Sequence, residues 1–276
     1  MQKTKTRPLS LFKVFQPFYS SFRQSYLLKE FVSRDIRGRF AGSMAGSLWT
    51  IIHPFATILS YYFVFSMVLR VGVTVEETGT DRFVIFFLAG FFPWIMFADS
   101  VGKSVGIIVQ QAGLITKVVF PVELLPLSTV ISAFILQGIG LLIFLFYLLL
   151  IGSFHPVWSL LPVVLLMEFL FALGFSYGLA ALCVFMRDTG ELLTIIMMLW
   201  FFATPVIYPG SMVPENLRFM LYVNPMFGFV DIVRDILLKH TLDFLLLIQM
   251  GAISIVVYLA GAWFFMKSRN AFGDVL

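Results

Sequence analysis

Six apolar stretches dominate the sequence and set the narrowest limit on what it can fold into. They run over 50–69, 83–101, 130–152, 160–183, 192–208 and 244–266. A helix needs about 20 apolar residues to cross a hydrocarbon core of roughly 30 Å. Because lipid offers the backbone no hydrogen-bond partners, each crossing segment is expected to be helical. The sequence therefore predicts an all-α polytopic membrane protein with six transmembrane helices.

The amino-acid composition agrees with a membrane protein and excludes a water-soluble domain. Hydrophobic residues make up 60% of the chain and charged residues 12%, which is too apolar for a water-soluble domain. The net charge is +4, but the basic residues gather at the edges of the apolar stretches, so we expect no nucleic-acid partner. Cys183, the single cysteine, lies inside a stretch and is expected to pack there rather than form a disulfide. No metal site is predicted.

The distribution of Lys and Arg predicts the orientation. With the N-terminus in the cytoplasm, 14 of the 19 basic residues lie inside and five outside. The inner residues are nine in the N-terminal segment, two between the second and third stretches, one between the fourth and fifth, and two in the tail. The outer five are Arg70, Arg82, Arg218, Arg234 and Lys239. We therefore expect a multi-pass membrane protein with both termini cytoplasmic.

Residues 1–46 are predicted to form a cytoplasmic arm, and 47–276 the six-span domain. Within the arm, 18–40 are too polar to cross, yet their apolar residues recur at roughly helical spacing with Arg and Lys between them. Those apolar residues are Phe18, Phe22, Leu27, Leu28, Phe31, Val32 and Ile36. This pattern is typical of an amphipathic helix lying in the membrane interface. The alternative is a solvated basic arm.

Two connections carry too much polarity to be ordinary parts of a span. In 110–121, Gln110, Gln111 and Lys117 interrupt the apolar pattern, and Pro121 prevents a straight continuation. We predict a short amphipathic helix there, parallel to the cytoplasmic face. The connection 209–242 mixes apolar residues with charges, so it is too polar to span and too apolar for a free loop. We predict short helices that re-enter the outer leaflet between the fifth and sixth spans.

The chain offers no enzyme chemistry. Gly102-Lys103-Ser104 resembles the end of a phosphate-binding loop, but the glycine required five residues earlier is replaced by Phe97. The three histidines are scattered, and no nucleophile–base motif is present. We therefore expect a transport subunit without a cofactor of its own. If ATP drives transport, a separate chain must bind it.

Charged and aromatic residues in the stretches allow two interpretations each. Asp99 and Lys103 are four residues apart, so a structural ion pair is preferred to an ion pathway. Glu168 is the isolated acid deep in a stretch, and an interhelical hydrogen bond is preferred to a proton relay. Aromatic residues form 17% of the chain, typical of lipid-facing packing or of a surface that stacks on sugar rings. The pairs Gly42/Gly46, Gly102/Gly106 and Gly174/Gly178 have the spacing that allows close helix approach within spans.

Six motifs occur in one order along these segments. The first is Arg34-Asp35-Ile36-Arg37-Gly38-Arg39-Phe40, followed by Gly42-Ser43, Gly46, Leu48-Trp49 and Pro54. Next come Gly113-Leu114-Ile115-Thr116-Lys117-Val118-Val119-Phe120-Pro121 and Leu125-Pro126-Leu127. The series ends with Phe185-Met186-Arg187-Asp188, Phe201-Phe202-Ala203-Thr204-Pro205-Val206-Ile207-Tyr208-Pro209, and Asn224-Pro225 with Arg234. In this order the chain resembles the membrane subunit of type-two ABC exporters, in the branch that exports O-antigen, capsule and teichoic acid. The family usually has Tyr where this chain has Phe40.

The resemblance implies a homodimer of this chain above two ATP-binding subunits, with Mg and ATP on those partners. It implies that an undecaprenyl-linked polysaccharide is moved from the cytoplasmic side. Carried over to this sequence, the ATPase-coupling residues are Gln110, Gln111, Leu114, Ile115, Lys117, Arg34 and Asp35. Arg37 and Arg39 are candidates for contact with the lipid pyrophosphate or with ordinary lipid headgroups. Candidates for the translocation path are Tyr61, Tyr62, Phe65, Trp200, Phe201, Phe202 and Tyr208.

Two alternatives stay open. The same architecture could export a smaller glycolipid or a drug, because the width of the path is not readable from sequence. A proton-coupled carrier without an ATPase would instead use Glu168 or Asp99 as its titrating group.

Overall fold

The structure, a computed structural model, describes residues 20, 23–70, 72–118 and 120–276. Within this part of the chain the regular structure is helical, apart from an isolated bridge between Gly72 and Arg82. Five helical segments are long and apolar enough to cross a membrane. They are Trp49–Val68 (α3, Trp49–Tyr62, continued by a π-helical Phe63–Val68), α5 (Phe83–Ser104), α8 (Leu124–Leu150), Pro156–Phe185 (with α9, Leu161–Phe185) and Phe244–Val275 (with α13, Phe244–Ser268).

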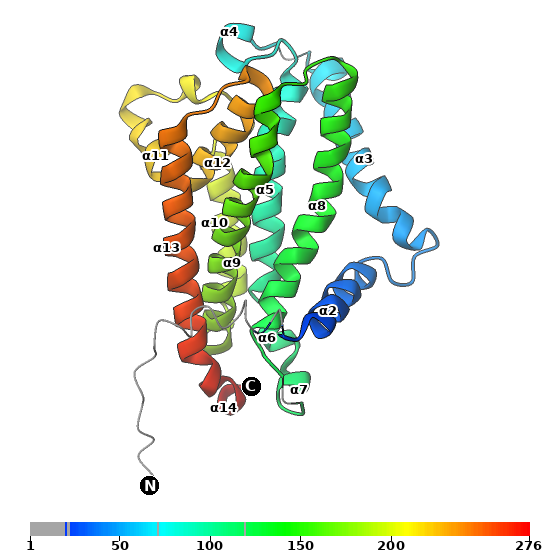
Figure 1. Cartoon of the computed structure of the whole chain (residues 1–276), viewed down its shortest axis with the longest axis vertical. Helices are drawn as coiled ribbons and strands as arrows, with labels where there is room; N and C mark the ends of the chain where they lie inside the picture. The colour runs from blue at the N-terminus through cyan, green and yellow to red at the C-terminus, as the bar shows by residue number, and fades with distance from the viewer. Residues whose placement is uncertain (1–19, 21–22, 71, 119) are drawn as a thin grey trace.

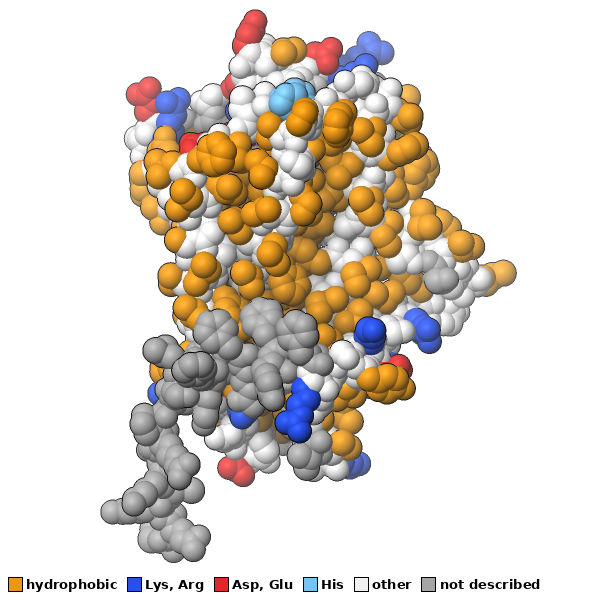
Figure 2. Space-filling view, in the orientation of Figure 1, with side chains coloured by type: hydrophobic (Ala, Val, Ile, Leu, Met, Phe, Trp, Pro, Cys, Tyr) orange, Lys and Arg blue, Asp and Glu red, His pale blue; other side chains and the backbone are white. Residues whose placement is uncertain are grey.

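The spanning helices form a bundle along the long axis of the molecule, and α3 leans away from it (Figure 1). One end of the bundle, here called the α2 end, carries α2 (Ser25–Gly38), α6 (Ile107–Gln110), α7 (Ala112–Ile115) and α14 (Phe272–Val275). The opposite α12 end carries α4 (Val75–Thr78), α11 (Phe219–Val223) and α12 (Pro225–Arg234). Hydrophobic side chains cover the middle of the visible face, and charged ones lie toward the two ends (Figure 2).

Close packing of α9 against α13 rests on glycine. A Cβ on Gly174 would lie 2.6 Å from the backbone nitrogen of Tyr258, and one on Gly261 would collide with the carbonyl of Gly174. The predicted close approach at Gly174 is therefore confirmed. The other two pairs behave differently. Gly42 and Gly46 lie in the turn after α2 with positive φ, and an added Cβ at Gly102 would meet nothing.

The fifth predicted span is shorter than expected. Its helix, α10, runs from Thr189 to Ala203, and the prediction of a helix through Tyr208 is wrong. Pro205 explains the end, because a proline disfavours helical backbone in the residue before it, and Thr204 is extended. At 15 residues, α10 is shorter than the roughly 20 residues that a straight crossing needs.

Both polar connections contain short helices. In 110–121 the helix is α7, which has four residues and is separated from the four-residue α6 at Gln111, where the backbone leaves the helical region. Helices are present between α10 and α13, namely α11, α12 and a π-helical Asp235–Lys239. The helix expected within 18–40 corresponds to α2, while Phe18 and Phe22 lie outside the described residues.

Candidate functional site

A hollow at the α2 end brings α2 together with the segment that contains α6 and Gln111. Its volume is about 340 Å³, and Arg34 and Asp35 of α2 line it with Gln110 and Gln111. Four of the seven residues predicted to couple to an ATPase therefore share one cavity. Of the other three, Leu114 and Ile115 are half-buried and pack against the core, and Lys117 is exposed.

Apolar packing fixes α2 at this position. Phe31, the buried residue of the helix, makes an edge-to-face contact with Phe120, with ring centroids 5.7 Å apart. The guanidinium of Arg34 lies 5.2 Å from the Phe31 ring centroid. Ser132 of α8 donates a 3.5 Å hydrogen bond to the carbonyl of Val32. The polar face of α2 is thereby directed toward the hollow.

An ion-pair network joins α2 to α5. Arg39 donates to Asp99 at 2.9 Å and to Asp35 at 3.3 Å, and Lys103 Nζ lies 2.6 Å from the second oxygen of Asp99. The predicted Asp99–Lys103 pair is confirmed, with Gln137 of α8 as a further donor at 3.4 Å. Arg37, the other predicted phosphate-binding residue, is exposed. Arg39 and Arg37 thus differ: Arg39 is held by protein carboxylates, and Arg37 is free to meet solvent.

A second hollow, of about 450 Å³, opens beside this network. Arg39, Lys103, Trp49, His53 and Gln137 are among its lining residues. Arg39 and Lys103 line it around Asp99, and Arg39 also pairs with Asp35, so the two cations of this network are balanced by two carboxylates. His53 and Gln137 were not predicted, because neither stands out in the sequence from an ordinary span residue.

Glu123 forms a second link at the α2 end that sequence reasoning missed. Its carboxylate, 1% exposed, accepts from Ser20 at 2.9 Å and from Arg269 at 3.3 Å, while its carbonyl accepts from Tyr177 at 3.0 Å. The residue therefore ties the beginning of α8 to α9 and to both terminal segments. The sequence signal that could have identified this link is the charged side chain of Glu123 close to the beginning of an apolar stretch.

The predicted path aromatics divide into inward and outward groups. Tyr61 packs against Phe87 with centroids 4.5 Å apart, and Trp200 packs against Phe97 at 5.2 Å. Phe65 and Phe201 lie with these inward groups, on Phe83 and Trp94. Tyr62 and Phe202 are instead exposed on the surface. Tyr208 is half-buried and donates a 2.6 Å hydrogen bond to the carbonyl of Phe202.

Asn224 organises the break after α10. Its Oδ1 caps α12 by accepting from the backbone of Met226 at 3.1 Å and also accepts from Trp200 Nε1 at 2.8 Å. Its Nδ2 donates to Thr204 Oγ1 at 2.8 Å. One side chain thus connects the end of α10 to the beginning of α12. This accounts for the pairing of the Thr204-Pro205 and Asn224-Pro225 motifs.

Arg234 completes the junction from the far end of α12. Its guanidinium donates to the carbonyls of Pro205 and Val206 at 2.7 Å each and to Phe86 of α5 at 3.3 Å. It also lies 3.6 Å from the Phe86 ring centroid, in the space left by Gly90. Burial lowers the pKa of Arg234 to about 9, so the group stays protonated at neutral pH. Its position was predicted, but its partners were not.

Glu168 departs from expectation. It is fully buried in α9, and neither carboxyl oxygen has a hydrogen-bond partner among the described residues. The preferred interhelical hydrogen bond is therefore absent in that part of the chain. An ionised carboxylate in such surroundings would be costly.

The spanning helices, with polar hollows at the α2 end and the junction of α10 with α12, define a multi-pass α-helical membrane protein. Comparison with known proteins gives the family. The model of the ABC-2 type transporter family matches residues 26–238, so the chain belongs to that family.

Named relatives extend over nearly the whole chain. An O-antigen export system permease protein RfbA of Myxococcus xanthus is 34% identical, covering 90% of this chain and 94% of the relative. A protein of the same name from Klebsiella pneumoniae is 28% identical over 91% and 95% of the two chains. The polysialic acid transport protein KpsM of Escherichia coli is 26% identical over 73% and 77%.

Proposed function

We propose that this chain is the permease half of an ATP-driven exporter that moves a lipid-linked polysaccharide, of O-antigen or capsule type, out of the cytoplasm. The observation that carries the proposal is the near full-length likeness to O-antigen export permeases. The chain belongs to a transporter family, and its sequence has no complete phosphate-binding loop. ATP hydrolysis is therefore assigned to two separate subunits.

The α2 end is the proposed cytoplasmic face. The count of Lys and Arg supports this orientation, which puts both termini inside. The ATPase is then proposed to contact the hollow lined by Arg34, Asp35, Gln110 and Gln111. Lys117, in the same connection as the two glutamines, is exposed and available to the same partner. ATP binding would move α2 and the coupling segment together, since both line that cavity. The Arg39–Asp99 pair would carry this movement to α5.

Two copies of the chain are proposed to enclose the path. Support comes from the outward apolar faces of α3 and α10, which no described part of the chain covers. Tyr62 and Phe202 lie on those faces and are the aromatics most available to a passing glycan. In this arrangement α10 with 204–208 is the sixth crossing segment, completed by the Asn224 and Arg234 contacts. The helices α11 and α12 then re-enter the outer leaflet.

The hollow beside Asp99 is the proposed entry site for the undecaprenyl pyrophosphate. Arg39 and Lys103 line it and would donate to the pyrophosphate in exchange for part of their contacts with Asp35 and Asp99. Arg37, two residues before Arg39 in the chain, is exposed, and we assign it to contact with lipid headgroups. A smaller glycolipid with the same headgroup chemistry would fit equally, so the size of the glycan is an outcome of the test.

A proton-coupled carrier is the second candidate, because Glu168 is buried without a hydrogen-bond partner in the described residues. Glu168→Gln separates the two. A glutamine keeps the shape but removes the titration, so an ATP-driven exporter should retain transport. Loss of transport with normal insertion would favour the carrier.

The deciding experiment is purification of the tagged chain from its native host, followed by reconstitution in liposomes with lipid-linked glycan. We expect a stoichiometric ATPase to co-purify and glycan to move only with ATP. Lys117→Glu should uncouple hydrolysis from movement, whereas Lys267→Glu, the same charge reversal at an exposed lysine near the end of α13, serves as the matched control. The second coupling variant, Leu114→Asp, should act in the same way as Lys117→Glu. A chain that purifies alone and moves solute without ATP would contradict the proposal.

A further inference from the structure

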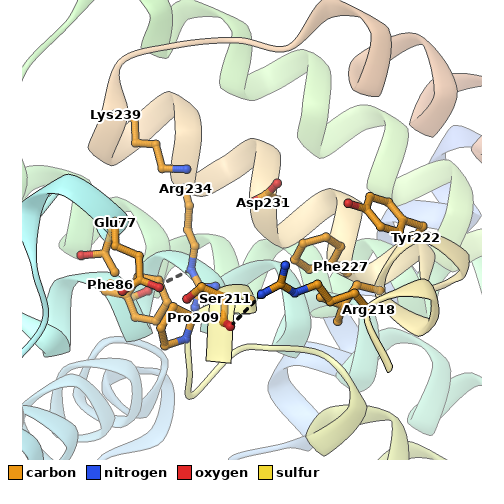
Figure 3. Close-up of a pocket in the computed structure, with 13 residues that line it drawn as sticks. Glu77, Phe86, Pro209, Ser211, Arg218, Tyr222, Phe227, Asp231, Arg234 and Lys239 are labelled. Carbon is orange, nitrogen blue, oxygen red and sulfur yellow. Dashed lines mark hydrogen bonds between the residues drawn. The ribbon is translucent and has the colours of Figure 1, made fainter. Parts of the chain in front are cut away.

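A third hollow lies at the α12 end, away from the coupling face. Its volume is about 320 Å³, near the lower limit of the 300–1,000 Å³ typical of ligand pockets. Five chain segments form it: α4, the N-terminal part of α5, the 209–222 connection, α12 and the π-helical Asp235–Lys239 (Figure 3). Lys239, Arg234 and Glu77 lie toward one side, Tyr222, Phe227 and Arg218 toward the other, and Asp231 between them.

The cations of this hollow are already engaged by the protein. Lys239 Nζ lies 2.8 Å from Asp235, and the guanidinium of Arg234 donates its hydrogen bonds to backbone carbonyls. Arg218 donates to the carbonyls of Val213 at 3.2 Å and Ser211 at 3.4 Å. Little positive charge is left to bind an anion, so a phosphate or a uronate is disfavoured.

Two carboxylates of this hollow differ from the cations, because the described residues do not pair with them. Asp231 and Glu77 line the hollow and make no ion pair or side-chain hydrogen bond among the described residues. Asp231 is half-buried, and burial together with the nearby Asp235 raises its pKa. Unpaired carboxyl oxygens at a cavity wall accept hydrogen bonds from hydroxyl groups. The hollow therefore offers acceptors to a neutral ligand rich in donors.

Aromatic side chains supply the remaining surface. Tyr222, which is 85% exposed, lines the hollow, and Phe227 lines it as well. Apolar C–H groups that pack on an exposed aromatic ring stabilise the contact by burying apolar surface. Hydroxyl groups stabilise a carboxylate by donating hydrogen bonds to it. Sugar rings carry both kinds of group on one small rigid body.

We propose that this hollow binds a short neutral hexose segment, held by hydroxyl hydrogen bonds to Asp231 and Glu77 and by stacking on Tyr222. The inference rests on the proposed function, in which the α12 end is the outer face and the ligand is part of the emerging glycan. A saccharide held there would be hindered from slipping back between strokes of the ATPase.

The test is saturation-transfer NMR on the complete transporter in nanodiscs. The probes are dextran and α-mannan oligosaccharides, with oligogalacturonate as the acidic counterpart. We expect transfer to the neutral probes and none to the acidic one. Asp231→Asn and Tyr222→Ala should each weaken neutral binding about tenfold, the loss expected for one charged hydrogen bond or one stacked ring. Phe219→Ala is the matched control, since Phe219 is exposed on the same helix as Tyr222 and does not line the hollow.

Three results would overturn the inference: no transfer to either neutral probe, transfer to oligogalacturonate alone, or binding that both variants leave unchanged. Its failure is distinguishable from failure of the proposed function. Reconstituted wild-type complex that exports glycan with ATP while the hollow binds no sugar would refute the pocket alone. A wild-type complex that binds neutral sugars but moves no glycan with ATP would refute the exporter.

Discussion

Helices α3 and α5 are both apolar enough to cross a membrane, yet their surroundings are opposite. The most apolar window of α5 has a mean hydropathy of 1.9 and is 78% buried. That of α3 has a mean hydropathy of 1.6, and none of it is buried. Hydropathy therefore identifies a helix that can span but does not distinguish a core helix from a peripheral one. The difference comes from what each helix touches.

The comparison separates a fixed part of the protomer from a less constrained part. α5 contacts α8, α9 and α12 and receives Arg234 and Arg39 at its two ends. α3 instead contacts mainly α8 and is continued by the π-helical Phe63–Val68. Both helices contain a proline, Pro54 in α3 and Pro93 in α5, so the π-helical turn and the sparse contacts set α3 apart. We infer that α5 is the frame of the protomer and that α3 and α10 are less constrained.

The largest expected effect comes from removing the outer anchor of that frame. Arg234→Met leaves the buried carbonyls of Pro205 and Val206 without donors. Each unsatisfied buried acceptor costs about 1–3 kcal/mol, so a loss of about 3–5 kcal/mol is expected. A thermal-stability assay in detergent should show a fall of roughly 10 °C.

Arg218→Met is the control for this variant, because Arg218 is 45% exposed and donates to carbonyls of a surface connection. It should shift the melting temperature by about 2 °C or less. Arg234→Lys should fall between, since one ammonium cannot serve all three carbonyls. A stable Arg234→Met protein would show that α12 is held to α5 by packing alone.

The next largest effect tests the glycine contact of α9 with α13. Gly174→Ala places a methyl group 2.6 Å from the backbone nitrogen of Tyr258, whereas Gly178→Ala places one 3.8 Å from Gly261. Overpacking of this kind costs about 1–3 kcal/mol, so the first variant should melt several degrees lower and the second near wild type. Equal melting temperatures would mean that α13 shifts freely along α9.

A smaller effect is expected at the α2 end. Asp99→Asn removes the shared partner of Arg39 and Lys103, which are 16% and 40% exposed, so solvent moderates the loss to about 1–2 kcal/mol. We expect ATP hydrolysis to persist and glycan transport to fall, because α2 is no longer tied to α5. Asp188→Asn, exposed at the beginning of α10, is the control and should change neither. Unchanged transport in Asp99→Asn would remove the proposed link.

The sequence predicted the individual helices better than it predicted which of them contact one another. Apolar length located α5, α8, α9 and α13, since a span is a property of one segment. The end of α10 was misplaced because the apolar pattern continues through Pro205, and the proline decides the backbone. The pairing of Arg34 and Asp35 with Gln110 and Gln111 came only through a family resemblance, because about 75 residues separate the two segments.

Contacts between distant residues could not be read from the chain. Nothing in the sequence pairs Arg234 with the carbonyls of Pro205, Val206 and Phe86. Nor does it predict that Glu168 has no hydrogen-bond partner among the described residues. Inward Tyr61 and outward Tyr62 are neighbours in the chain, and only helix packing assigns their faces. Burial and partner choice belong to the tertiary arrangement, and the pattern of residue types constrains them weakly.

The smallest effect on the protomer should come from the free face of α10. Leu199 is 60% exposed and Leu193, on the same helix, is 7% exposed. Leu199→Asn should change the melting temperature of the protomer by about 1–2 °C, while Leu193→Asn should lower it several times more. The proposed dimer responds in the opposite order: native mass spectrometry should show fewer dimers for Leu199→Asn, because a polar group then interrupts the apolar face between copies. If Leu199→Asn melted as low as Leu193→Asn and kept its dimers, α10 would belong to the fixed core, and the contrast with α5 would hold for α3 alone.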